Sequence, residues 1–167
     1  MKNKLRNLIL ISFILILGIV ISHFFLPQGN ILIIENEFLI TFVGVILGIS
    51  ATIITFIFSS TEKVWNIIDD TYSDKEKSQQ IQKKFKLGYQ ELVEDSNFIF
   101  IIFVLVITCV IVSYIDIPKI SFPSCLPKKQ VLQDIKMGLF LNCIVATGDL
   151  FFSLANILKL VLYEKHV

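Results

Sequence analysis

Apolar and polar residues follow one another along this chain in long blocks, not with a short period. Four blocks, residues 7–26, 38–59, 98–115 and 137–160, consist mainly of Leu, Ile, Val, Phe and small residues. Each block is close to the roughly 20 residues that a helix rising about 1.5 Å per residue needs to cross a hydrocarbon core of about 30 Å. The pattern predicts an all-α, polytopic membrane protein with four transmembrane helices in a single domain spanning residues 1–167.

The composition indicates a membrane environment, and the distribution of charged residues predicts the orientation of the chain in it. The chain is 54% hydrophobic and 17% charged, whereas soluble domains carry about 25% charged residues. Basic residues concentrate before the first block, in the loop 60–97 and after the last block, so the positive-inside rule places both termini and this loop in the cytoplasm. We expect a bacterial inner membrane protein. The first block is too long for a cleaved secretion signal, and no small-x-small cleavage site follows it.

The loop 60–97 shows helical spacing on both sides of a break at TYSDKE, where Ser73 and Glu76 match a capping box. We therefore expect a cytoplasmic helical hairpin, or stalk, with a kink or restart at residues 95–97 where the chain re-enters the membrane. Its apolar stripes must pack against each other, the membrane surface or a partner protein. The residues of these stripes that we assign to partner binding are Ile67, Tyr72, Ile81, Phe85 and Tyr89.

Two further stripes lie inside the predicted membrane spans. The fourth span carries polar residues at steps of three, four or seven residues, which place them on one helix face: Asn142, Asp149, Ser153 and Asn156. The second span carries a matching face of small residues that suits close helix packing: Gly44, Gly48, Thr52 and Thr55.

Asp149 lies near the middle of its block, and no Lys, Arg or His lies at the same depth. A carboxylate facing lipid at the bilayer centre costs about 2.5 to 3.5 kcal/mol on insertion scales, so Asp149 must face protein or water. Three interpretations stay open: hydrogen bonding between helices, the lining of a water-filled path or of a ring in a homo-oligomer, and an unrecognised ligand site.

The sequence offers little catalytic chemistry. Its two histidines, His23 and His166, lie outside the predicted membrane centre, and no phosphate-binding loop or dinucleotide fingerprint is present. We expect a non-enzyme without catalytic residues, metal ligands or cofactor. The net charge of +1 argues against direct nucleic-acid binding. The expected partners are membrane lipids, further copies of this chain and a cytoplasmic protein.

The four blocks, the cytoplasmic termini and the charged hairpin VWNIIDDTYSDKEKSQQIQKKFKLGYQELVED (64–95) together resemble the small four-helix membrane subunits of bacterial anti-phage defence systems, such as the Kiwa membrane component. The resemblance covers the whole chain and rests on architecture, so no functional residues are carried over. It implies an oligomeric membrane subunit that holds a cytoplasmic partner.

We therefore expect a homo-oligomeric inner-membrane sensor, effector or accessory subunit that engages a cytoplasmic partner in bacterial defence. A small ion or proton channel lined by the fourth span is the first alternative. A membrane immunity protein against a bacteriocin or toxin is the second.

Overall fold

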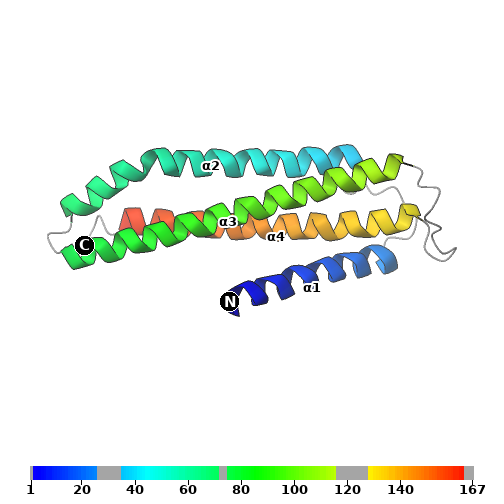
Figure 1. Ribbon diagram of the computed structural model, residues 1–167, viewed down its shortest axis with the longest axis horizontal. Coiled ribbons are helices and arrows are strands. Elements are labelled where there is room, and N and C mark those ends of the chain that lie inside the picture. The colour runs from blue at the N-terminus through cyan, green and yellow to red at the C-terminus, as the bar shows by residue number, and fades with distance from the viewer. Residues whose placement is uncertain (1, 26–34, 72–74, 116–127, 164–167) are drawn as a thin grey trace. The chain divides into compact units, whose positions relative to one another are not determined.

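A computed structural model describes residues 2–25, 35–71, 75–115 and 128–163 of the chain; for residues 2–10, 25, 67, 70–71 and 161–163 the backbone alone is described. Four α-helices make up nearly all of this part of the chain. They are α1 (Lys2–Phe25), α2 (Asn36–Thr71), α3 (Lys75–Tyr114) and α4 (Lys128–Tyr163) (Figure 1). The prediction of an all-helical protein is confirmed for the described residues.

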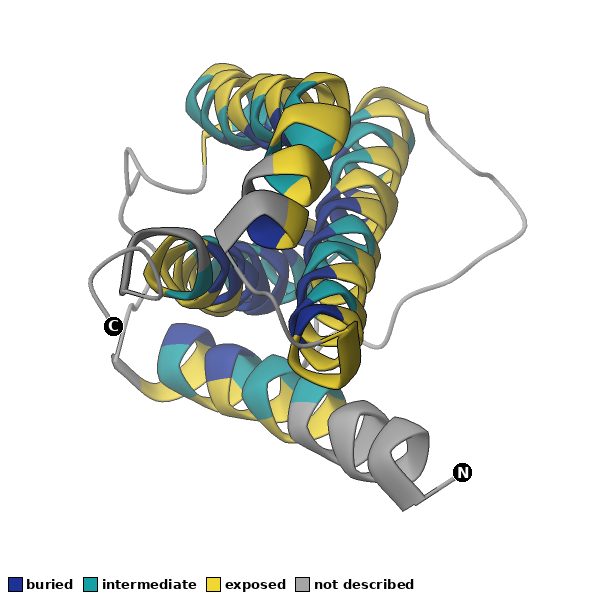
Figure 2. Cartoon of the chain, turned by 90° about the vertical axis from the view of Figure 1, so that its left-hand side faces the viewer, coloured by how far each residue is buried: buried dark blue, intermediate teal, exposed yellow. Residues whose placement is uncertain are grey.

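Three of the helices, α2, α3 and α4, are long and apolar enough to cross a membrane. The apolar part of α1 among the described side chains, Ile11–Phe24, is shorter. On the helices, buried residues gather on one side and exposed residues on the other (Figure 2). Large apolar side chains dominate many exposed sides, and Phe13, Phe56, Phe58 and Phe152 are each more than 60% exposed. Such surfaces are typical of helices that face lipid.

The helix boundaries correct two expectations. No break occurs at residues 95–97, because α3 runs as one helix from Lys75 to Tyr114. The fourth helix, expected at residues 137–160, also begins earlier, because α4 already starts at Lys128. Pro127 is the last proline before it, and nothing beyond that proline opposes helix formation. The end of α2 at Thr71 agrees with the predicted break, whereas Ser73 lies outside the described residues.

The fraction of buried residues in each helix also differs from expectation. Within the most apolar window of each helix, 39% of residues are buried in α4, 28% in α3 and 17% in α2. The sequence analysis found faces suited to helix packing in the second and fourth spans and assigned none to the third. The stripe of Ile99, Ile102 and Val106 on α3 is instead buried. An apolar run around a whole helix hides which side packs, because lipid and protein interiors accept the same residues.

The chain divides into two compact units, the first comprising residues 1–45 and 99–145. In this unit α1 packs on α4 through two glycines. A Cβ atom added to Gly18 would lie 2.5 Å from the Cα atom of Gly138, a distance at which only glycine fits. At the start of α2, the buried Lys136 of α4 donates to the side-chain oxygen of Asn36. The rings of Phe42 and Phe140 also pack together there, with centroids 5.3 Å apart.

The second unit comprises residues 46–98 and 146–167. Its core joins three helices through a cluster of buried residues, Ile57 of α2, Phe85 and Leu92 of α3, and Ile157 of α4. Near the far end of α2, Asp69 accepts hydrogen bonds from Ser78 Oγ at 2.5 Å and Gln82 Nε2 at 3.0 Å. These bonds tie the end of α2 to the first turns of α3.

Candidate functional site

A buried contact between two hydroxyl groups sets the register of α2 against α3. The Oγ atoms of Ser50 and Ser96 lie 3.0 Å apart, and both side chains are buried. Ser50 donates its proton to the carbonyl of Leu47 at 2.8 Å, so Ser96 is the donor in the contact between the helices. Ser50 lies within the apolar stretch 38–59 of α2, whereas Ser96 lies just before the apolar stretch of α3 begins at residue 98.

A second polar contact sets the register of α3 against α4. The buried Ser153 donates to a carboxylate oxygen of Asp95, which is half-buried, at 3.2 Å. The apolar stretch of α4 continues past Ser153 to about residue 160. Asp95 therefore lies beside apolar residues of α4, although it belongs to the polar part of α3.

Together the two contacts stagger the apolar stretches of the three helices. Residues 88–97 of α3, GYQELVEDSN, run alongside apolar residues of both α2 and α4, as the core cluster of Ile57, Leu92 and Ile157 also shows. Ten helical residues extend about 15 Å, half of a hydrocarbon core of about 30 Å. Residues 88–97 of α3 thus place polar side chains beside the apolar stretches of α2 and α4 over a length equal to about half of a hydrocarbon core.

Asp149 lies on the exposed side of α4 beside this polar part of α3. Its carboxylate is close enough to Asp95 to repel it electrostatically, as are Glu91 and Glu94. We call this group, which also includes Ser153, the polar strip. It gathers four carboxylates on adjoining surfaces of α3 and α4, and Ser153 donates a hydrogen bond to one of them, Asp95.

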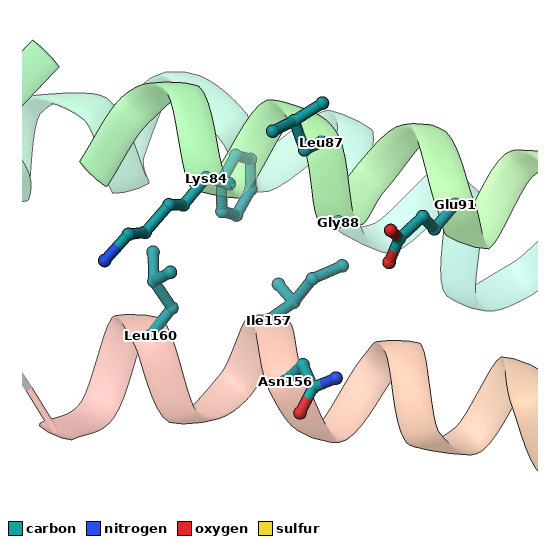
Figure 3. A pocket seen from close by; sticks show the side chains of 8 residues that line it. Lys84, Leu87, Gly88, Glu91, Asn156, Ile157 and Leu160 are labelled. Atoms are coloured by element: carbon teal, nitrogen blue, oxygen red, sulfur yellow. The ribbon is translucent and has the colours of Figure 1, made fainter. Parts of the chain in front are cut away.

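Toward the start of α3, the polar strip continues into a half-open groove of about 210 Å³ between α3 and α4. Lys84 and Glu91 lie at opposite ends of the groove, and Ile157 and Leu160 line the space between them (Figure 3). Gly88 lets Ile157 pack closely against α3, because a Cβ atom there would lie 2.9 Å from Ile157 Cγ1.

The structure separates the four predicted seam residues into two pairs. Asn142 and Ser153 are buried, whereas Asp149 and Asn156 are exposed. Asn142 donates to the carbonyl of Gly138 in its own helix at 2.9 Å, so this bond does not join two helices. Asn156 lines the groove. The seam therefore lies at the border between the buried and exposed sides of α4.

The small-residue face of α2 lies largely open. Gly44 would bring a Cβ atom within 3.5 Å of the Phe103 ring of α3, whereas Gly48 has nothing within 4 Å. Thr52 and Thr55 are exposed and donate to carbonyls in their own helix, those of Gly48 at 2.8 Å and Ala51 at 2.9 Å. The closest glycine packing is found in α1 and α4.

The residues predicted to bind a partner lie mostly inside the chain. Ile81 and Phe85 are buried, and the half-buried Tyr89 packs against the core cluster of the second unit. Tyr72 lies outside the described residues, as does the side chain of Ile67. The sequence analysis considered packing of the hairpin stripes against each other, the membrane surface or a partner protein. The described residues of the stripes pack against each other and against α4.

Asp95, Ser96 and Glu91 are the residues of this site that the sequence analysis assigned elsewhere. It placed residues 95–97 at the membrane surface because the apolar block of α3 begins after them. The available signal was length: the apolar stretch of α3 is shorter than those of α2 and α4. Helices of one bundle with unequal apolar lengths cannot all match the membrane at both ends.

Among the described residues, no group of three or more His, Cys, Asp or Glu side chains is arranged to hold a metal ion. Comparison of the chain with protein-family models, curated proteins and solved structures gives no match. The resemblance to membrane subunits of defence systems stays a prediction from architecture.

The contact between Asp95 and Ser153 gives a testable prediction. Ser153→Ala removes the donor from a half-buried carboxylate, and we expect the free energy of unfolding to fall by about 1 to 3 kcal/mol. Ser59→Ala is the matched control, because Ser59 is exposed and donates to Phe56 of its own helix; it should change stability by less than about 0.5 kcal/mol. Denaturant unfolding in detergent micelles measures both, and equal losses would contradict the assigned role.

Proposed function

We propose that this chain is a four-span protein of the bacterial inner membrane that works as a homo-oligomer, as a sensor, effector or accessory subunit that engages a cytoplasmic partner. Both termini and the hairpin formed by the end of α2 and the start of α3 lie in the cytoplasm, according to the distribution of basic residues. The observation that carries the proposal is the exposed polar strip at the depth of apolar residues. The defence setting comes from the resemblance in architecture.

The argument for assembly begins with the cost of placing the strip in lipid. Each lipid-exposed carboxylate at the centre of a helix costs about 2.5 to 3.5 kcal/mol on insertion scales. A membrane boundary at residue 97 of α3 does not solve the problem, since it leaves the exposed Phe56, Phe58 and Leu158 in water. Further copies that cover the strip satisfy both requirements, because α2 and α4 then keep their apolar sides toward lipid.

The chain also presents a surface suited to covering such a strip. On α2 the exposed Gly48, Thr52 and Thr55 follow helical spacing on the side away from Ser50. Small residues let helix backbones approach closely in lipid. A copy that presents this side to the strip of its neighbour makes a heterologous contact, and such contacts form a ring where the rotation between copies closes.

A soluble partner is expected to contact the exposed side of the hairpin, because the apolar stripes are occupied inside the chain. At the start of α3 this side is basic, with five exposed lysines: Lys75, Lys77, Lys83, Lys84 and Lys86. Leu87 and Trp65 add apolar area, at 51% and 42% exposure. These features favour an acidic partner surface with apolar contacts at its centre.

A small cation or proton channel is the second candidate, and the four clustered carboxylates favour it. Rings of Asp or Glu side chains are a known basis of cation selectivity. In a ring of copies, Asp149 and Glu91 of each chain would add to one acidic lining. The path would follow α3 as well as α4, whereas the sequence had suggested α4 alone.

Cross-linking tests the assembly. In a variant with the three native cysteines replaced and Thr52→Cys introduced on the exposed side of α2, Phe152→Cys lies one helical turn from Asp149, whereas the matched Phe151→Cys points to another side of α4. Both positions are exposed. In membranes treated with a short bifunctional maleimide, we expect severalfold more cross-linked chains from Phe152→Cys. Equal yields at the two positions, or none at either, would argue against assembly through the strip.

Membrane potential tests the channel. We expect bacteria that produce the wild-type chain to depolarise, and Asp149→Asn or Asp95→Asn to reduce the effect to less than about a tenth, because a neutral amide no longer attracts cations. Glu62→Gln is the control, since it removes an exposed carboxylate outside the strip. Protein levels and cross-linking should be the same in all variants. Depolarisation that is unchanged by the Asp149 and Asp95 substitutions would rule out the channel. It would not contradict the proposed assembly, which cross-linking tests separately.

Charge reversal on the hairpin tests partner binding. Lys83→Glu together with Lys86→Glu should lower the recovery of a co-purified soluble protein by about tenfold or more, since like charges then face each other across the interface. Lys63→Glu, an equally exposed position on α2, controls for charge alone. Substitution within the internal stripes is avoided because it removes core contacts. Undiminished recovery from the double variant would exclude this surface.

A further inference from the structure

The groove between α3 and α4 carries opposite charges at its two ends. All of its lining belongs to the second compact unit. Lys84 and Glu91 of α3 lie at opposite ends, with Ile157 and Leu160 of α4 between them (Figure 3). Both charged residues are exposed, as is Asn156, which lies on α4 near Glu91. The groove therefore offers a cation, an apolar surface and an anion in sequence.

The size of the groove limits what it can hold. Lys84 and Glu91 are seven residues apart, so they lie on the same side of α3, about 10.5 Å apart along its axis. The volume of about 210 Å³ is below the roughly 300 to 1,000 Å³ of sites that enclose a drug-sized ligand. The groove suits a short group that carries a negative and a positive charge a few bonds apart, while the rest of the molecule stays outside.

The position of the groove relative to the membrane follows from the ends of the apolar stretches. These stretches end at residue 59 in α2 and at about residue 160 in α4. Ile57 and Ile157, close to those ends, pack in one cluster with Phe85, and Ile157 also lines the groove. Beyond residue 59, α2 exposes Trp65, a residue type enriched at membrane interfaces. With the proposed topology, the groove lies at the level of the inner-leaflet headgroups.

We propose that the groove binds the headgroup of a phospholipid that carries both a phosphate and a primary ammonium, as phosphatidylethanolamine does. Lys84 donates to the phosphate, and the side-chain oxygens of Glu91 and Asn156 accept from the ammonium. Ile157 and Leu160 contact the carbon atoms of the headgroup, and the acyl chains stay in the bilayer. The site depends on the proposed function for its placement at the membrane, but it requires neither assembly nor conduction.

The charges of the groove distinguish this headgroup from those of other phospholipids. An anionic lipid without an ammonium is attracted by Lys84 but repelled by Glu91. A quaternary ammonium keeps its positive charge but has no N–H group to donate to Glu91 or Asn156. The exposed lysines at the start of α3 attract anionic lipids without discriminating among them. A preference for a primary ammonium therefore reports on the groove, not on the basic surface around it.

Lipid binding to the purified full-length protein tests the site. The protein is stripped of lipid in detergent and offered equal amounts of three phospholipids with the same acyl chains and an ethanolamine, choline or glycerol headgroup. Native mass spectrometry then measures the lipid that each chain retains. We expect the ethanolamine lipid to be retained about tenfold more than either of the others, because it alone makes the charged hydrogen bonds at both ends. Equal retention, or a preference for the glycerol lipid, would overturn the proposal.

Substitutions at the two ends of the groove locate the binding. Glu91→Gln should lower retention of the ethanolamine lipid about tenfold and leave that of the glycerol lipid no lower, whereas Lys84→Gln should lower both. Glu62→Gln and Lys63→Gln remove one anion and one cation at neighbouring exposed positions of α2 and should match wild type. An ethanolamine preference that persists in Glu91→Gln would exclude this groove.

Failure of the lipid site is distinguishable from failure of the proposed function. Retention of the chain in membranes after an alkaline wash tests its membrane placement, and the cross-linking from Phe152→Cys tests assembly. A chain that passes both tests but shows no headgroup preference would refute the groove as a lipid site and leave the proposed function standing.

Discussion

Two buried hydroxyl contacts, Ser50 with Ser96 and Ser153 with Asp95, fix how far α3 is shifted along its neighbours. Apolar side chains alone leave helices free to slide in lipid, since lipid and protein offer them the same surroundings. Hydroxyl and carboxylate groups within apolar surroundings prevent this sliding, because each group that loses its hydrogen-bond partner there is costly. The register of α3, and with it the depth of its acidic residues, therefore depends on these few polar atoms.

The resulting stagger brings exposed carboxylates of α3 beside exposed apolar side chains of α2 and α4. These two groups favour opposite surroundings, water and lipid. The helices α2 and α4 expose large apolar side chains suited to lipid, such as Phe56 and Phe152. The helix α3 exposes Glu91 and Glu94 beside them. A membrane boundary on one side of the acidic residues places them in lipid. A boundary on the other side places the exposed apolar side chains of α2 and α4 in water. The proposed assembly would remove both mismatches, since further copies can enclose the polar strip and leave the apolar sides outward.

The sequence predicted the helical class and the break after α2, because each depends on the order of residues within one segment. Which helices pack closely against each other was harder to predict from the sequence. Gly44 and Gly48 fit the standard packing pattern, yet the closest approach joins Gly18 and Gly138, which no local spacing relates. Asp95 was placed at the membrane surface for the same reason: its depth is set by Ser153, on another helix, and the block boundary of α3 alone does not reveal it.

The continuity of α3 connects the hairpin with the acidic residues. One unbroken helix carries the exposed lysines of its first turns, then Glu91 and Asp95, and then the apolar stretch. Asp69 binds Ser78 and Gln82, so the start of α3 cannot shift without the end of α2. A load on the hairpin is therefore borne by the helix that holds Asp95 against Ser153. In the proposed function, a partner bound to the hairpin would act on the register of the polar strip through the continuous backbone of α3, without a hinge.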